Sequence, residues 1–187
     1  MDRRTFLKGA GLSTLAAGSA PALAQALASG AFAAEGRANF HFDCQVKGPL
    51  AGSVQHFLAI AGCGSLNDAE VEGGGGFLHF DLNSPIPRTI FGSGSWKARR
   101  LVSFQPFGNP YGVFQAGIAH LNIDLVRVVP SRLVLPATLR IVCNVGPAGA
   151  ASVTAFPESI VLHTDGLTFD TPVAGLTVFT IGVQEKD

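Results

Sequence analysis

The chain has 187 residues, of which 47% are hydrophobic and 14% charged, and it carries no formal net charge. This composition is typical of one globular domain with a substantial core, and it excludes a disordered chain. A net charge of zero argues against general electrostatic attraction to nucleic acid or to an anionic membrane surface, so neither is predicted as a partner.

Residues 1–24 have the three parts of an export signal, namely paired arginines, a modest apolar segment and a small-residue cleavage site. The arginine motif consists of Arg3, Arg4, Phe6, Leu7 and Lys8. The apolar segment, 9–20, is shorter than the roughly 18 apolar residues that a membrane-spanning helix needs. Ala22 and Ala24 suit cleavage after Ala24, and Ala28 marks an alternative cleavage site.

The order Arg-Arg-Thr-Phe-Leu-Lys resembles the twin-arginine signal, whose receptor recognises the arginine pair. This resemblance covers the leader alone. It implies two partners, the twin-arginine translocon and a signal peptidase, and export to the periplasm, the cell surface or the exterior with no stable membrane anchor after cleavage. We therefore expect a signal peptide at 1–24, a spacer at 25–38 and a mature domain at 39–187.

The mature chain begins with two segments of strand character. Residues 40–46 alternate apolar and polar side chains, and 54–62 are nearly all apolar. We expect these segments to form a hairpin with Cys44 opposite Phe57, because their apolar faces then coincide. This register leaves Cys44 about six residues from Cys63 along the ladder, too far for a disulfide.

Glycine and proline then interrupt the chain. The acidic stretch 67–72 is interpreted as a loop and the four glycines, 73–76, as a flexible connection, because successive glycines have little conformational preference. Residues 77–82 return to a strand, which argues against a phosphate-binding loop because such a loop leads into a helix. The segment 105–111, with two prolines, is interpreted as another loop.

The second half of the chain contains two further pairs of strands. The long segment 113–128 is predicted to pair with 137–145 across a turn near Arg132, in a register that sets Asp124 opposite Arg140. Two shorter strands follow, joined by a two-residue turn at Asp165 and Gly166, and then a last strand. About nine strands without helical periodicity predict an all-β fold, a single-domain antiparallel β-sandwich, with a closed β-barrel as the alternative.

Three His-x-Asp pairs each place two polar side chains on one strand face, since positions i and i+2 share a face. The pairs are His41 with Asp43, His79 with Asp81, and His163 with Asp165. The first two are candidates for a metal or acid–base site, but a polar strand face explains them without a metal. The sequence has none of the stronger metal-binding spacings, so no metal and no cofactor are predicted.

A second candidate site is the densest basic stretch of the chain, Trp96, Lys97, Arg99 and Arg100. This combination suits stacking on a sugar ring or holding an anionic polymer. Basic residues that protect an edge strand from aggregation are the alternative interpretation.

The 14 phenylalanines of the chain allow two interpretations as well. They would line a small-molecule cavity if the strands form a barrel, and otherwise they fill a large core. With three cysteines at most one disulfide can form within the chain, and any such bond should involve Cys143.

Two functional hypotheses follow. The first is an exported soluble β-sandwich protein with a binding or structural role outside the cytoplasm. The alternative is an exported β-barrel enzyme or small-ligand carrier that uses an apolar cavity with His and Asp groups. No Gly-x-Ser-x-Gly elbow occurs, so no catalytic residue is assigned and enzymatic activity is left open. An interior pocket would favour the alternative, and a filled interface between sheets the first hypothesis.

Overall fold

A computed structural model describes residues 38–67, 70–145 and 158–181. The predicted signal peptide, and all but the last residue of the predicted spacer, lie outside these residues. The described strands all belong to one compact unit of the chain. Within them, no helix is long and apolar enough to cross a membrane.

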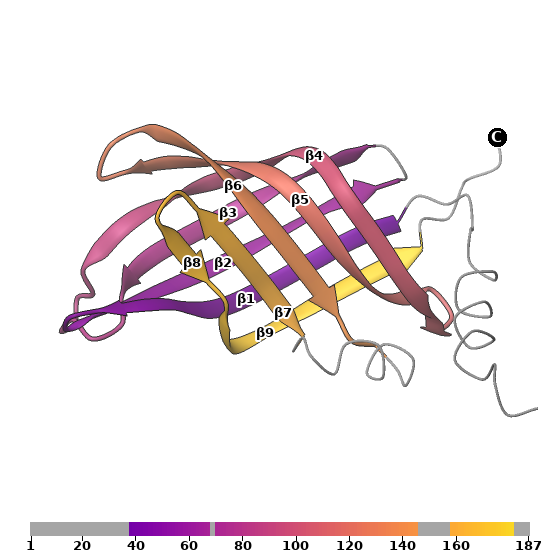
Figure 1. The fold of residues 1–187 in the computed structure, drawn as a ribbon, viewed down its shortest axis with the longest axis horizontal. Coiled ribbons are helices and arrows are strands. Elements are labelled where there is room, and N and C mark those ends of the chain that lie inside the picture. Colours follow the sequence, from indigo (N-terminus) through magenta and orange to yellow (C-terminus); the bar gives the residue numbers. More distant parts are fainter. Residues whose placement is uncertain (1–37, 68–69, 146–157, 182–187) are drawn as a thin grey trace, which may run out of the picture. The chain divides into compact units, whose positions relative to one another are not determined.

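Nine β-strands follow one another in the described part of the chain, and the predicted all-β fold is confirmed (Figure 1). The predicted hairpin that turns at Asp165 and Gly166 is also confirmed, and Gly166 has the positive φ, 87°, that such a turn requires. The strands are β1 (Ala38–Ala51), β2 (Val54–Leu66), β3 (Val71–Asp81), β4 (Ile90–Tyr111), β5 (Phe114–Val129), β6 (Leu133–Cys143), β7 (Ser159–Thr164), β8 (Leu167–Phe169) and β9 (Thr171–Ile181).

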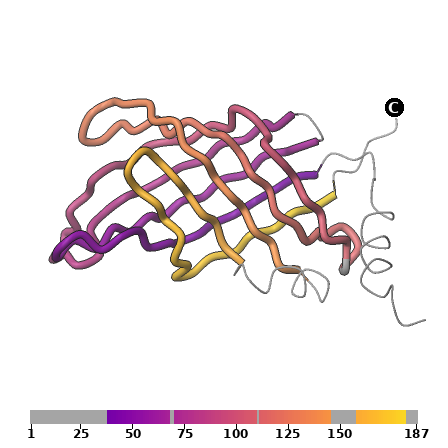
Figure 2. The backbone as a smooth tube through the Cα atoms, in the orientation of Figure 1, coloured from indigo at the N-terminus to yellow at the C-terminus, as the bar shows by residue number. Residues whose placement is uncertain are grey.

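All nine strands belong to one antiparallel sheet in the order β4-β3-β2-β1-β9-β5-β6-β7-β8, and β4 pairs in addition with β5. Because β5 pairs with β4 and also, over two residues, with β9, the sheet returns to its own starting edge. The strands β5 to β8 therefore cross over β1 to β3 (Figure 1, Figure 2). Contacts of β1 with β7 and β8 show that the two parts pack together around the main core.

The alternation predicted for the first strand is confirmed, because Phe40, Phe42 and Cys44 are buried while their neighbours are exposed. The register predicted for its hairpin is wrong. β1 continues past the expected turn through a bulge and ends at Ala51, so Cys44 lies opposite Ile60. The glycine and proline that suggested a turn instead fall within the strand, where the bulge accommodates them.

The four glycines, 73–76, are not a flexible connection but part of β3, where they pair with β2. At Gly75 the neighbour is the side chain of Trp96, which is buried, stacks on Phe42 and donates a hydrogen bond of 3.0 Å from Nε1 to the carbonyl oxygen of Ala61. A Cβ on Gly75 would lie 2.7 Å from Trp96 Nε1. Gly75 therefore leaves room for the indole ring, whereas a Cβ on Gly73 would lie 2.8 Å from the ring of Phe40 and a Cβ on Gly74 would lie 2.8 Å from the carbonyl oxygen of Trp96.

The segment 105–111 is not a loop either. It forms the end of β4, a strand of 22 residues. Five register irregularities against β5 let this long strand bend around the core, and one of them lies beside Pro106. A proline within the strand is tolerated where the ladder is interrupted.

The second predicted register is also wrong, although β5 and β6 do pair. Asp124 lies opposite Pro136 and not Arg140, because β6 begins as early as Leu133 and the ladder is shifted by four residues. An even shift keeps the same apolar face toward the core. The Asp124 carboxylate instead forms an ion pair with Arg99 of β4, with 2.6 Å between Arg99 Nε and Asp124 Oδ2.

Candidate ligand-binding cavity

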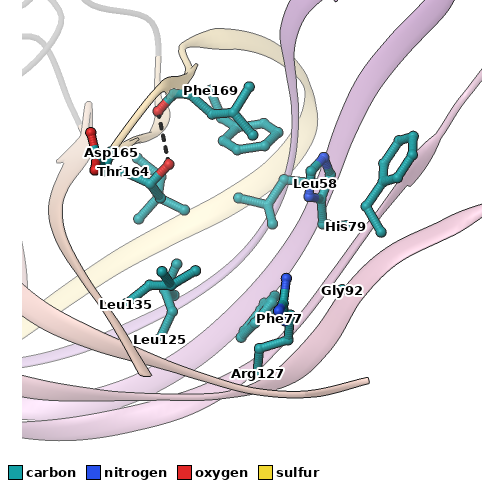
Figure 3. Close-up of a pocket in the computed structure, with 13 residues that line it drawn as sticks. Leu58, Phe77, His79, Gly92, Leu125, Arg127, Leu135, Thr164, Asp165 and Phe169 are labelled. Carbon is teal, nitrogen blue, oxygen red and sulfur yellow. Dashed lines mark hydrogen bonds between the residues drawn. The ribbon is translucent and has the colours of Figure 1, made fainter. Parts of the chain in front are cut away.

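A cavity of about 190 Å³ opens at the end of the sheet where β3 and β5 end and β4 and β6 begin. One wall comes from β2, β3 and β4, and the opposite wall from the β7–β8 hairpin, with β5 and β6 between them. Figure 3 shows the labelled side chains of both walls around a common space. Most of the lining is leucine and phenylalanine.

Strand alternation arranges this end of the core in two layers. A layer of apolar side chains lies deeper, and the next residue on the same face, nearer the strand end, is polar on four strands. The deeper residues are Leu58, Phe77, Leu125 and Leu162. The polar residues, which we call the rim, are His56, His79, Arg127 and Thr164, and all of them except His56 line the cavity. The cavity is therefore apolar at depth and polar at its mouth.

Two histidines of the rim form a hydrogen-bonded pair. His56 Nδ1 and His79 Nε2 lie 2.9 Å apart, and the ring of Phe91 packs against both imidazoles. The ring of Phe169 meets His79 edge-on, with 5.1 Å between the ring centroids. Burial, and to a lesser extent the neighbouring His56, lowers the pKa of His79 from 6.5 to about 4. At neutral pH the His79 ring is uncharged.

The other polar groups at the mouth are partly satisfied within the protein. Arg127 donates a hydrogen bond from Nε to the carbonyl oxygen of Ser131, at 3.2 Å. The hydroxyl of Thr164 donates to the carbonyl oxygen of Leu167, also at 3.2 Å. Asp165 is exposed in the β7–β8 turn. The mouth thus carries one positively charged side chain, Arg127, and one negatively charged side chain, Asp165.

The structure separates the two members of the predicted pair His79 and Asp81. His79 lines the cavity, whereas the Asp81 carboxylate accepts hydrogen bonds from the backbone N–H groups of Gln55, at 3.0 Å, and Asn83, at 2.9 Å. Asp81 therefore organises the turn after β3. It does not orient His79, whose ring nitrogen is engaged with His56.

The remaining His-x-Asp pairs lie outside the core. His41 and Asp43 are exposed on the outer face of β1, which is the polar-face arrangement. His163 is exposed and its Nδ1 lies 3.0 Å from Thr168 Oγ1. Among residues 38–67, 70–145 and 158–181, no group of three or more His, Cys, Asp or Glu side chains is placed to hold a metal ion.

The basic stretch of β4 is not a single surface. Trp96 points into the core, while Lys97 and Arg99 are exposed on the other side of the strand and Arg100 follows a bulge. Alternation along a strand separates neighbouring residues in this way. Trp96 is therefore unavailable for stacking on a ligand at that surface, and Arg99 is engaged with Asp124.

The cysteines lie apart from the cavity lining and form no disulfide. Cys44 and Cys143 are buried and Cys63 is exposed. Burial raises the pKa of the Cys44 thiol to about 11 and also raises the pKa of Cys143. Both thiols are therefore protonated at neutral pH and poorly suited to act as nucleophiles.

Sequence reasoning identified His79 but missed His56 and Arg127. A signal for both existed: His56 lies two residues before Leu58 and Arg127 two residues after Leu125, so each is a polar side chain on a core-facing row. Such a residue near a strand end indicates an opening of the core to solvent.

The size and lining of the cavity suit one small, mainly apolar molecule. Its volume exceeds the roughly 150 Å³ of an apolar cavity that holds benzene, and it is smaller than the roughly 300 Å³ of the smallest drug-sized pockets. The chain matches no family model, no curated protein and no solved structure. The geometry of the cavity is thus the basis for a functional assignment.

Proposed function

We propose that this protein is exported by the twin-arginine route and binds a small, mainly apolar molecule in the cavity at the end of its sheet. The observation that carries this proposal is a cavity of about 190 Å³, apolar at depth and polar only at its rim. Water gains few hydrogen bonds in such a space, so an apolar ligand can occupy it at little desolvation cost. The leader motif that contains Arg3 and Arg4 supports export.

The expected affinity is modest. For a single-ring compound, a ligand efficiency of about 0.7 kcal/mol per non-hydrogen atom corresponds to a dissociation constant on the order of 0.1 to 1 mM. A natural ligand that also contacts the rim would bind more tightly, because its polar group would gain a hydrogen bond there.

Calorimetric titration of the full chain with toluene tests the proposal through a matched pair of variants. Leu135→Trp enlarges a half-buried side chain in the cavity lining, and Leu78→Trp makes the same change on the partly exposed outer side of β3. We expect Leu135→Trp to weaken toluene binding at least tenfold and Leu78→Trp to leave it within twofold. Failure of the unmodified chain to bind toluene, or binding unaffected by Leu135→Trp, would contradict the proposal.

A further inference from the structure

We infer that the ligand of this cavity is an uncharged single-ring molecule with a hydroxyl group, and that the hydroxyl forms a hydrogen bond with Nδ1 of His79. This inference rests on the proposed binding function and names the class of molecule that the site takes. Phenol is the simplest member of the class. Within the cavity, His79 is then the residue that determines specificity.

The histidine pair explains why a hydroxyl group is favoured. His56 Nδ1 and His79 Nε2 share one hydrogen bond, so only one of these two nitrogens bears a proton when both rings are neutral. If His56 Nδ1 donates the proton of this hydrogen bond, then the proton of the His79 ring lies on its Nδ1, which can donate it to the ligand. If His79 donates, its Nδ1 offers a lone pair. A hydroxyl group both donates and accepts, so it satisfies His79 in either arrangement.

The charges around the cavity explain why the ligand is neutral. The ionisable side chains of the described lining are His79, Arg127 and Asp165. Burial keeps His79 uncharged at neutral pH, and the cation and the anion at the mouth oppose each other. A carboxylate or an ammonium group would lose hydration on entering without gaining a net opposite charge. The hydroxyl group loses less hydration and recovers a hydrogen bond.

The rings around His79 explain why the ligand itself is a ring. Phe91 and Phe169 lie with their ring centroids 5.1 Å from that of His79, and Phe77 lines the adjacent part of the wall. Flat aromatic walls of this kind pack best against another ring, in offset or edge-to-face geometry. The volume of about 190 Å³ exceeds the roughly 150 Å³ of an apolar cavity that holds benzene, so one such ring fits.

Phenol and toluene provide the test, because they have nearly the same shape and differ in the hydroxyl group. We expect His79→Phe to lower the ratio of phenol affinity to toluene affinity roughly 3- to 10-fold while toluene binding stays within twofold. His79→Leu, which also has no hydrogen-bonding group but a smaller side chain, should lower the ratio similarly and serves as the deciding variant if His79→Phe does not fold. His41→Phe, the same change on the exposed outer face of β1, should leave the ratio unchanged.

The outcomes separate this inference from the proposed function. Toluene binding with a ratio that both His79 variants leave within twofold of the original would overturn the inference and leave the proposed function in place. Tighter binding of benzoate or benzylamine than of phenol would also overturn it. If the unmodified chain binds neither phenol nor toluene, both the inference and the proposed function fail.

Discussion

Two adjacent glycines of β3 should differ widely in the stability that each loses on substitution by alanine. A Cβ on Gly75 would lie 1.9 Å from the carbonyl oxygen of Ala61 and 2.7 Å from Trp96 Nε1, whereas at Gly76 the nearest atom is the carbonyl oxygen of Gly94, at 3.7 Å. Gly75→Ala must therefore displace the neighbouring strand or the indole ring. Gly76→Ala adds a methyl group in ordinary contact distance on the exposed side of the strand.

The expected cost at Gly75 has two parts. Overpacking a tight core costs about 1 to 3 kcal/mol. Displacement of Trp96 also breaks its hydrogen bond of 3.0 Å to Ala61 and leaves a buried donor unsatisfied, at a cost of about 1 to 3 kcal/mol. We expect Gly75→Ala to lower the free energy of unfolding by about 2 to 6 kcal/mol, the sum of these two parts. Gly76→Ala should change it by less than about 1 kcal/mol, because alanine also restricts the unfolded chain.

Urea denaturation followed by tryptophan fluorescence measures this difference. Trp96 is the single tryptophan of the chain, and it is buried, so its emission reports directly on the packing in question. The transition of Gly75→Ala should move to much lower urea concentration than that of Gly76→Ala. Equal midpoints for the two variants would refute the argument, since β2 and β3 would then separate enough to admit a side chain without loss.

Three further predictions concern charge. Because the folded pKa of His79 is about 4 and the ordinary value is 6.5, the unfolded chain binds the additional proton between these pH values. The stability contributed by neutral His79 is therefore complete above pH 6.5 and is lost as the pH falls toward 4, by about 1 to 2 kcal/mol after allowance for the solvent around this half-buried ring. His79→Gln should make the free energy of unfolding less dependent on pH across that range. The same pH dependence in this variant and in the unmodified chain would contradict the lowered pKa of His79. Asp124→Asn should cost no more than about 1 kcal/mol in thermal unfolding, because its partner Arg99 is 60% exposed, and a larger loss would count against a surface ion pair. Replacing both Arg3 and Arg4 with lysine should retain the precursor in the cytoplasm, since the receptor recognises guanidinium groups, and undiminished export in cell fractionation would exclude the twin-arginine route.

The sequence by itself determined the properties that depend on neighbouring residues. The alternation of residues 40–46 identified both a strand and its buried face, and the turn at Asp165 and Gly166 identified a hairpin. Side-chain alternation and turn chemistry are local, so they survive whatever the strands pair with. The all-β class and the approximate number of strands could therefore be predicted.

Registers could not be predicted in the same way. Burial discriminates only between the two faces of a strand, and the bulge that shifts the β1–β2 ladder by three residues was not recognised, because its glycine and proline suggested a turn. The actual ladder of β5 and β6 is shifted by four residues from the expected one, yet the same side chains face the core. The shift changes only which residues lie opposite one another, so that Asp124 lies opposite Pro136. The glycines 73–76 show the same limit, since local preference indicated flexibility, whereas the indole ring of Trp96, on a neighbouring strand, requires the lack of a side chain at Gly75.

The candidate cavity depended on tertiary structure most of all. His79 was a candidate from the sequence because it lies two residues from Asp81 on one strand, but its partner in the structure is His56 on another strand. That contact requires the register of β2 against β3. The cavity also requires the curl of the sheet that brings the β7–β8 hairpin opposite these strands. Both are relations between segments far apart in the chain, which no local pattern of residues specifies.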